Sequence, residues 1–121
     1  MDRASILMPL LVAAVIATAC RDVSIPRVQG DAENGRLLLR QFGCGTCHRI
    51  PGVAGAQGNV GPPLEGIAQR IYLAGILPNQ PDNMIRWIRE PHSVNPRTLM
   101  PDLQVTEPHA RDMAAYLYQL R

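Results

Sequence analysis

The segment Cys44-Gly45-Thr46-Cys47-His48 constrains this chain more than any other part of it. Two cysteines at positions i and i+3, followed directly by a histidine, form the attachment pattern of a c-type haem. On one helical turn both thiols lie on the same side, where they can add to the two vinyl groups of the porphyrin. The pattern therefore predicts one haem bound covalently through Cys44 and Cys47, with the imidazole of His48 as one ligand of the iron.

Two other interpretations of the cysteine pair compete with haem attachment, namely a redox dithiol and half of a zinc site. A zinc site needs two more ligands, and the remaining candidates Cys20, His92 and His109 are scattered along the chain. A thioredoxin-like dithiol lies at a strand-to-helix turn in an α/β pattern, which this sequence lacks. The haem interpretation is the one that the pattern favours.

Composition agrees with a small helical domain built around a cofactor. The chain has 121 residues, which suggests a single domain, and its 12 basic residues are all arginine, set against 10 acidic ones. No basic run is long enough to indicate nucleic-acid binding. The 11 prolines and 10 glycines indicate loops and short helices, and an aromatic content of 4% supplies little bulk for a core. A buried haem would provide the missing apolar surface, so we expect an all-α fold wrapped around it.

The N-terminal residues resemble a targeting segment. The 14-residue apolar run from Ile6 to Ala19 would span about 21 Å, less than a hydrocarbon core of about 30 Å. The small residues before Cys20 resemble a lipoprotein cleavage box, which would make Cys20 a lipidated N-terminus. An ordinary signal peptide or a short uncleaved anchor, with Cys20 incidental, remains open. We expect a signal peptide over residues 1–19, a lipidated tether over 20–30 and a haem domain over 31–121.

The rest of the chain predicts four helices separated by loops. The first helix is expected over residues 32–42, capped by Asp31, and the third over 81–89, stopped by Pro91. The last is expected to begin after the cap Thr106, and a short helix is expected over residues 65–74. Residues 51–60 are expected to form a flexible glycine-rich loop, and residues 93–105 an extended segment. Gly35 is either tolerated in its helix or marks a close crossing with another helix, and the second interpretation is favoured.

Three residues are candidates for the surroundings of the haem. Pro62 belongs to a rigid Pro-Pro segment whose carbonyls are free to accept, and a haem-ligating histidine usually donates its second ring N–H to such a group. Arg70 could neutralise a haem propionate or simply be solvated. Trp87, the only tryptophan, is either plain core or part of the pocket wall.

The second axial ligand must come from Met84, Met100, Met113, His92 or His109. Met84 and Met113 lie on apolar helix faces and suit core packing. Met100 lies in a proline-bounded loop that could cross the haem, which makes it the favoured ligand, with His92 next. Ligation by His and Met raises the potential and fills both axial positions, which favours electron transfer over catalysis.

At these residues the chain resembles the small His/Met cytochromes c, from about Gly30 to Leu120. The resemblance implies a fold of three to five short helices around one haem. It also implies that Leu64 packs on the ring, that the Thr98 hydroxyl lies near a propionate, and that Trp87 replaces a pocket tyrosine beside Met100.

A closer similarity links the segments Arg70–Asn79, Trp87–Pro91 and Met100–Leu103 to the cytochrome c domain fused to subunit II of some bacterial cytochrome c oxidases. In those proteins the domain passes electrons to the copper centre of the oxidase. Here the expected lipid-type anchor would stand in place of a copper-binding domain. The similarity implies an oxidase as partner.

The sequence therefore predicts a membrane-tethered monohaem cytochrome c that carries single electrons in a respiratory chain and is not an enzyme. It would lie on the outer, periplasmic face of the cytoplasmic membrane, with a quinol-oxidising complex as donor and a terminal oxidase as acceptor. The alternative is a haem subunit fixed within an oxidase or dehydrogenase complex, and an enzymatic rival would be a peroxidase-like or gas-binding cytochrome. The exchange surface would be the haem edge, near Arg49, and without lysine any docking ring must use arginine or be largely apolar.

Overall fold

The computed structural model of the chain describes residues 24–121. The predicted signal peptide over residues 1–19 and the lipidation of Cys20 lie outside these residues. In chain order the elements are α2 (Ala32–Gln41), the 3-10 turns η2 (Cys44–Thr46) and η3 (Ile67–Gln69), the strands β1 (Tyr72–Leu73) and β2 (Leu77–Pro78), and the helices α3 (Pro81–Arg89), α4 (Pro91–Val94) and α5 (Glu107–Leu117).

Three of the four expected helices are confirmed, and their first turns show why they start where they do. The Asp31 carboxylate accepts from the backbone N–H of Asn34 at 3.0 Å and so caps α2. Helices α3 and α5 each carry proline in the first turn, where its missing N–H is not needed. Thr106 precedes α5 as expected, although its side chain makes no capping hydrogen bond.

The expected helix over residues 65–74 is wrong. Gly66 adopts the left-handed conformation (φ 66°) and is followed only by the short turn η3 and then by the antiparallel hairpin β1–β2. The hairpin turns through Ala74 and Gly75, which both have positive φ, as the twist of a tight hairpin requires. Ile67 is buried, whereas Ile71 is 78% exposed.

The segment after α3 also differs from expectation at its start. Pro91 ends α3, and the same residue opens the one-turn helix α4, which occupies the beginning of the segment expected to be extended. Beyond Val94 the chain runs without helix or strand to Thr106. A proline can do both because it blocks the preceding helix and fits the first position of the next one.

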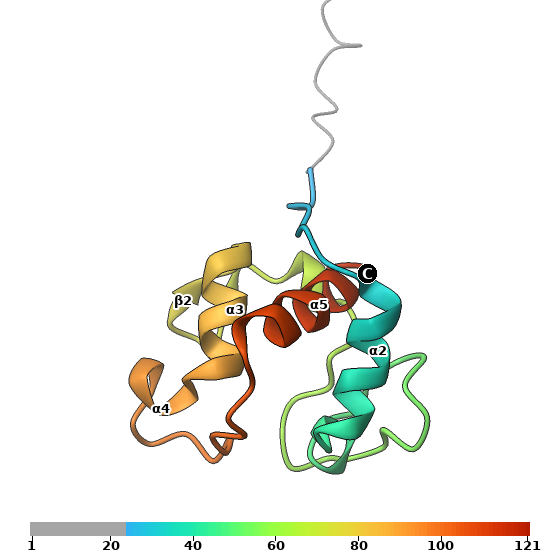
Figure 1. The fold of residues 1–121 in the computed structure, drawn as a ribbon. Helices are drawn as coiled ribbons and strands as arrows, with labels where there is room; N and C mark the ends of the chain where they lie inside the picture. Colours follow the sequence, from blue (N-terminus) through green and yellow to red (C-terminus); the bar gives the residue numbers. More distant parts are fainter. Residues whose placement is uncertain (1–23) are drawn as a thin grey trace, which may run out of the picture.

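Helix α5 lies between α2 and α3 and packs on both, so it is the centre of the fold (Figure 1). Met113 and Ala114 on α5 have no exposed surface. At the crossing with α2, a Cβ atom on Gly35 would lie 1.9 Å from the backbone oxygen of Asp112. The predicted close crossing at Gly35 is therefore confirmed, because no larger residue fits at this distance.

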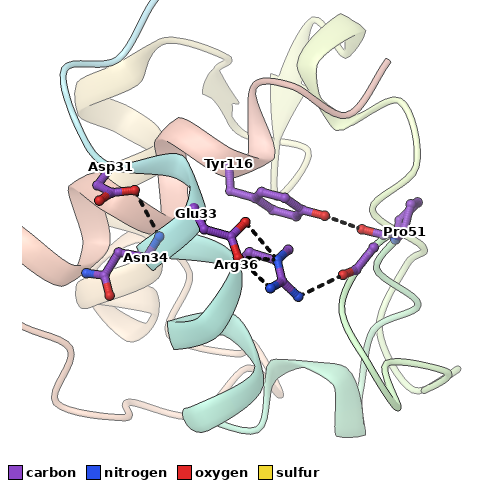
Figure 2. A network of polar contacts seen from close by, with 7 residues as sticks. Asp31, Glu33, Asn34, Arg36, Pro51 and Tyr116 are labelled. Atoms are coloured by element: carbon purple, nitrogen blue, oxygen red, sulfur yellow. Dashed lines mark hydrogen bonds and ion pairs between the residues drawn. The ribbon is translucent and has the colours of Figure 1, made fainter.

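Side-chain hydrogen bonds fasten one end of this crossing. The Asp112 carboxylate accepts from the backbone N–H of Asp31 and from the side-chain amide of Asn34, both at 2.8 Å. These bonds, the one from Asn34 first, lower the pKa of Asp112. Helix α5 therefore holds the N-terminal end of α2, which also carries the Asp31 cap (Figure 2).

Further along the same two helices, two side chains reach the loop that follows His48 (Figure 2). The Tyr116 hydroxyl of α5 donates to the Pro51 carbonyl at 2.7 Å. The Arg36 guanidinium of α2 pairs with Glu33 and also donates to the Gly52 carbonyl at 3.3 Å. The helix pair thus positions the loop from both sides.

The beginning of the described part lies against the domain. Ile25 and Val28, in the segment expected to be a tether, are partly buried against the core. The backbone at Gly30 comes close to α5, since a Cβ there would lie 2.8 Å from the Arg111 carbonyl oxygen. Within residues 24–121, no helix combines the length and the apolar character that a membrane crossing needs.

The variant Gly35→Ala tests the crossing. We expect it to lower the free energy of unfolding by about 1–3 kcal/mol. The added Cβ meets rigid backbone of α5, and the steric cost exceeds the gain of about 1 kcal/mol in helix propensity. Urea denaturation followed by far-UV circular dichroism measures the change. Gln41→Ala, on the exposed end of α2, is the matched control, and equal stability of both variants would contradict the packing argument.

Candidate functional site

A cavity of about 510 Å³ opens into the domain, within the range of about 300–1,000 Å³ common for small-molecule and cofactor sites. Its walls come from segments between Leu39 and Leu117, so most of the chain contributes to it. It brings together all nine residues that the sequence singled out for a cofactor: Cys44, Cys47, His48, Pro62, Leu64, Arg70, Trp87, Thr98 and Met100.

The two cysteines occupy the turn η2, which begins after Gly43 in the left-handed conformation (φ 74°). The backbone N–H of His48 donates to the Cys44 carbonyl at 3.0 Å, which places both thiols and the imidazole on one compact turn. Both cysteines are half-buried, and no disulfide joins them. Burial raises the pKa of Cys44, whereas a reactive redox dithiol needs a lowered pKa.

The loop over residues 51–60 is packed onto this turn, contrary to the expectation of a flexible loop. The backbone N–H of Gly58 donates to the Gly45 carbonyl at 3.0 Å. A Cβ on Gly45 would lie 2.6 Å from Ala56, and one on Gly58 would lie 2.4 Å from the Thr46 carbonyl oxygen. Gly45 and Gly58 therefore allow close backbone packing between the loop and the cysteine turn, whereas a Cβ on Gly55 would meet no neighbour.

His48 is held through its Nδ1. This nitrogen lies 2.7 Å from the Pro62 carbonyl oxygen, which can only accept, so Nδ1 carries a proton, and in the neutral imidazole the lone pair is on Nε2. Gly61 backs the ring, since a Cβ there would lie 2.4 Å from His48 Cε1. The Gly61 N–H donates to the Cys47 carbonyl at 2.8 Å, which ties this support to the cysteine turn. Sequence reasoning missed Gly61, although its place directly before Pro62 was a usable signal.

Three methionines line the cavity. Met84 and Met113 are 2% and 0% exposed and come from α3 and α5, whereas Met100 comes from the segment after α4 and is half-buried. Its backbone N–H donates to the Thr98 hydroxyl at 3.1 Å. His92 and His109, the other candidates for a second axial ligand, are not among the lining residues.

Charge is scarce in the cavity wall. Arg70 is its one residue with a permanent charge, and its guanidinium donates to the backbone carbonyls of Pro63 and Glu65. Arg49 lies outside the wall and pairs with the Glu65 carboxylate at 2.5 Å. Within residues 24–121, no three His, Cys, Asp or Glu side chains converge, so the cysteine pair has no further zinc ligands of these types there.

Asn79 fixes the part of the wall that carries Arg70 and Tyr72. Its side-chain amide donates to the carbonyls of Ile67 and Arg70, both at 2.8 Å. Its oxygen accepts from the hydroxyl of Tyr118 at 2.8 Å, which joins this wall to the C-terminal end of α5. Burial raises the pKa of Tyr118 to about 12.

The donor set fits a c-type haem. An apolar cavity that presents two thiols, an imidazole with a free Nε2 and a thioether holds the groups that attach and ligate this cofactor. Gly61 leaves room for the imidazole, where any Cβ would displace it. A single arginine at the wall suits a ligand that is apolar over most of its surface and carries carboxylates.

Comparison with known proteins shows a partial similarity to an oxidase subunit. No family model matches the chain. Over 91 residues the chain is 31% identical to cytochrome c oxidase subunit 2 of Alkalihalophilus pseudofirmus, and this match covers 74% of the chain. The chain spans about a quarter of that relative, 26% of its length. It is thus similar to one part of an oxidase subunit, in agreement with the resemblance to oxidase subunit II expected from the sequence.

Tyr118→Phe tests the link between α5 and the wall through pH. Between about pH 10 and 12 the folded protein keeps the Tyr118 proton while the unfolded chain loses it, so the stability of the wild type falls as the pH rises through this window. We expect the variant to show a shallower fall, measured by urea denaturation at stepped pH. Tyr72→Phe, exposed on the hairpin, is the control, and the same shallowing in both variants would contradict the assignment.

Proposed function

We propose that residues 31–121 form a small His/Met cytochrome c, an all-α domain around one covalently attached haem, and that the protein carries single electrons as a non-catalytic, membrane-tethered carrier. One observation supports this most: the cavity unites the cysteine turn, the supported imidazole of His48 and the thioether of Met100. These groups come from distant parts of the chain, so their convergence is not a consequence of the motif itself.

Haem, when bound, supplies a one-electron couple between ferrous and ferric iron. Cys44 and Cys47 would hold it by thioether bonds, and His48 would ligate through Nε2. The Pro62 carbonyl keeps the proton on Nδ1 and so fixes both the tautomer and the orientation of the ring, which makes the ligand more basic. Met100 would be the second ligand, and a thioether there favours the ferrous state.

The rest of the wall restricts access and holds the cofactor. Leu64 and Trp87 contribute apolar surface that would exclude water. Without water, the free-energy cost of the extra positive charge on ferric iron would rise. Arg70, already oriented by two backbone carbonyls, offers its charge to a propionate, and the Thr98 hydroxyl would lie near one. The chain's own residues would thus bind and orient the cofactor, and with His48 and Met100 as ligands they would leave no position for a substrate at the iron.

The proposed partners are a terminal cytochrome c oxidase as acceptor and a quinol-oxidising complex as donor, on the outer face of the cytoplasmic membrane. The name of the relative, an oxidase subunit, supports the acceptor. A haem subunit fixed in an oxidase or dehydrogenase complex is the second candidate, favoured by the same similarity. Purification in mild detergent separates the two, because a fixed subunit keeps a stoichiometric partner and a carrier does not.

Met100→Ala tests the ligand assignment. We expect the covalently attached haem to remain and the ferrous protein to bind carbon monoxide. The midpoint potential should decrease, by an amount inside the range of about 0.8 V over which axial ligands set haem potentials. A redox-titrated visible spectrum, with a denaturing gel stained for haem, measures all three.

Met84→Leu and Met113→Leu are the matched controls, since both residues also line the cavity. They should leave the ligand spectrum unchanged. If either control opens the iron while Met100→Ala does not, the ligand is misassigned, and a protein without covalent haem would refute the proposed function itself.

Cys20→Ser tests the tether. We expect the variant to move from the membrane fraction to the soluble fraction, because a lipid on Cys20 would be its main attachment. Membrane fractionation and the intact mass of the mature N-terminus provide the measurement. Retention on the membrane without a lipid adduct would indicate an uncleaved anchor or a bound partner in place of the lipid.

A further inference from the structure

Exposed apolar side chains gather at the mouth of the cavity. Val60, Tyr72 and Leu99 all line the cavity and yet are 68%, 55% and 88% exposed, so they form its rim. They come from three separate segments: the loop after His48, the hairpin β1–β2, and the segment next to Met100. We refer to these three side chains as the rim.

The hairpin region carries further exposed apolar side chains. Ile71 and Ile76, both more than half exposed, flank Tyr72 and the hairpin turn. Among the large hydrophobic residues exposed in residues 24–121, only Leu37 on α2 belongs neither to the rim nor to the hairpin. Single exposed hydrophobic residues need no explanation, but a gathering of this kind at a cavity marks an interaction surface.

The rim side chains and the cavity wall offer little charge to a partner, and the charged residues next along the chain from Leu99 are the exposed Arg97 and Asp102, which do not line the cavity. Arg70 is the one permanently charged residue of the wall, and its guanidinium is bonded to the carbonyls of Pro63 and Glu65. Nearby, Arg49 and Glu65 are paired with each other. A strongly acidic or basic partner face would lose hydration here without gaining an opposite charge, so charge complementarity favours an uncharged face.

We propose that the rim, extended by the hairpin's Ile71 and Ile76, is the surface on which a redox protein with an apolar, uncharged face docks to exchange electrons with the cofactor. The proposal rests on the proposed function and specifies the partner's chemistry. Docking at the rim brings the partner to the opening of the cavity, next to Met100. Because apolar contact is not screened by ions, exchange should depend little on ionic strength.

Electron self-exchange tests this without an identified partner, because a second copy of the holoprotein has the same rim. Exchange between ferrous and ferric copies is measured from NMR line broadening of mixtures at low and high salt. We expect the wild-type rate to change less than about twofold with salt. Leu99→Lys should slow exchange about fivefold or more at low salt, since it removes apolar contact and adds like-charge repulsion, and salt should partly restore the rate.

Leu37→Lys is the matched control, with the same change of net charge on an exposed leucine of α2 that does not line the cavity. It should leave the rate near that of the wild type. Equal slowing by both variants, no slowing by Leu99→Lys, or a wild-type rate that varies strongly with salt would overturn the proposal. The proposal would also be overturned if Leu99→Lys weakened binding to neutral phosphatidylcholine vesicles but left self-exchange unchanged. The rim would then contact lipid and not a protein.

Failure of the docking proposal and failure of the proposed function give different results. The visible spectrum and midpoint potential of each variant are recorded with the rates. A protein without haem contradicts the proposed function before any rate is measured. A protein with covalent haem, an unchanged potential and an unaffected rate in Leu99→Lys contradicts the docking proposal alone.

Discussion

The crossing of α2 and α5 at Gly35 is the contact on which the other parts of this structure depend. A Cβ at Gly35 would lie 1.9 Å from backbone of α5, so the two helices approach as closely as their main chains allow. Helix α5 also packs on α3, and its Met113 reaches the cavity wall. The distance between α2 and α5 therefore sets the position of both the core and the site, and a change at this contact would propagate to each.

From this crossing, a chain of contacts leads to the imidazole of His48. Arg36 and Tyr116, one on each helix, hold the carbonyls of Gly52 and Pro51. The loop that follows packs Gly58 on the cysteine turn, and its continuation at Gly61 backs the ring of His48. The helix pair thus positions, through this loop, an imidazole that neither helix contains.

The sequence predicted the parts of this structure that depend on local signals. Caps and prolines located α2, α3 and the start of α5, and the cysteine motif with Pro62 located residues that share one cavity. The hairpin β1–β2 was missed because Ala74, a residue that rarely takes positive φ, supplies half of its turn. The packed glycine loop was missed because composition reports a glycine's freedom but not the neighbour that requires its small size.

The distribution of charge separates the two faces of the domain. Ion pairs and carboxylate bonds lie along α2 and α5, where Glu33 pairs with Arg36, Glu107 with Arg111, and Asp112 bonds to the N-terminal end of α2. The cavity mouth has exposed apolar side chains and one arginine that is already bonded to backbone. A carrier that docked by long-range attraction would place its unpaired charges at the mouth. Several charges of this chain fasten helices, and Arg49 and Glu65 beside the cavity pair with each other, which favours the shape and apolar surface of the rim as the source of specificity at the mouth.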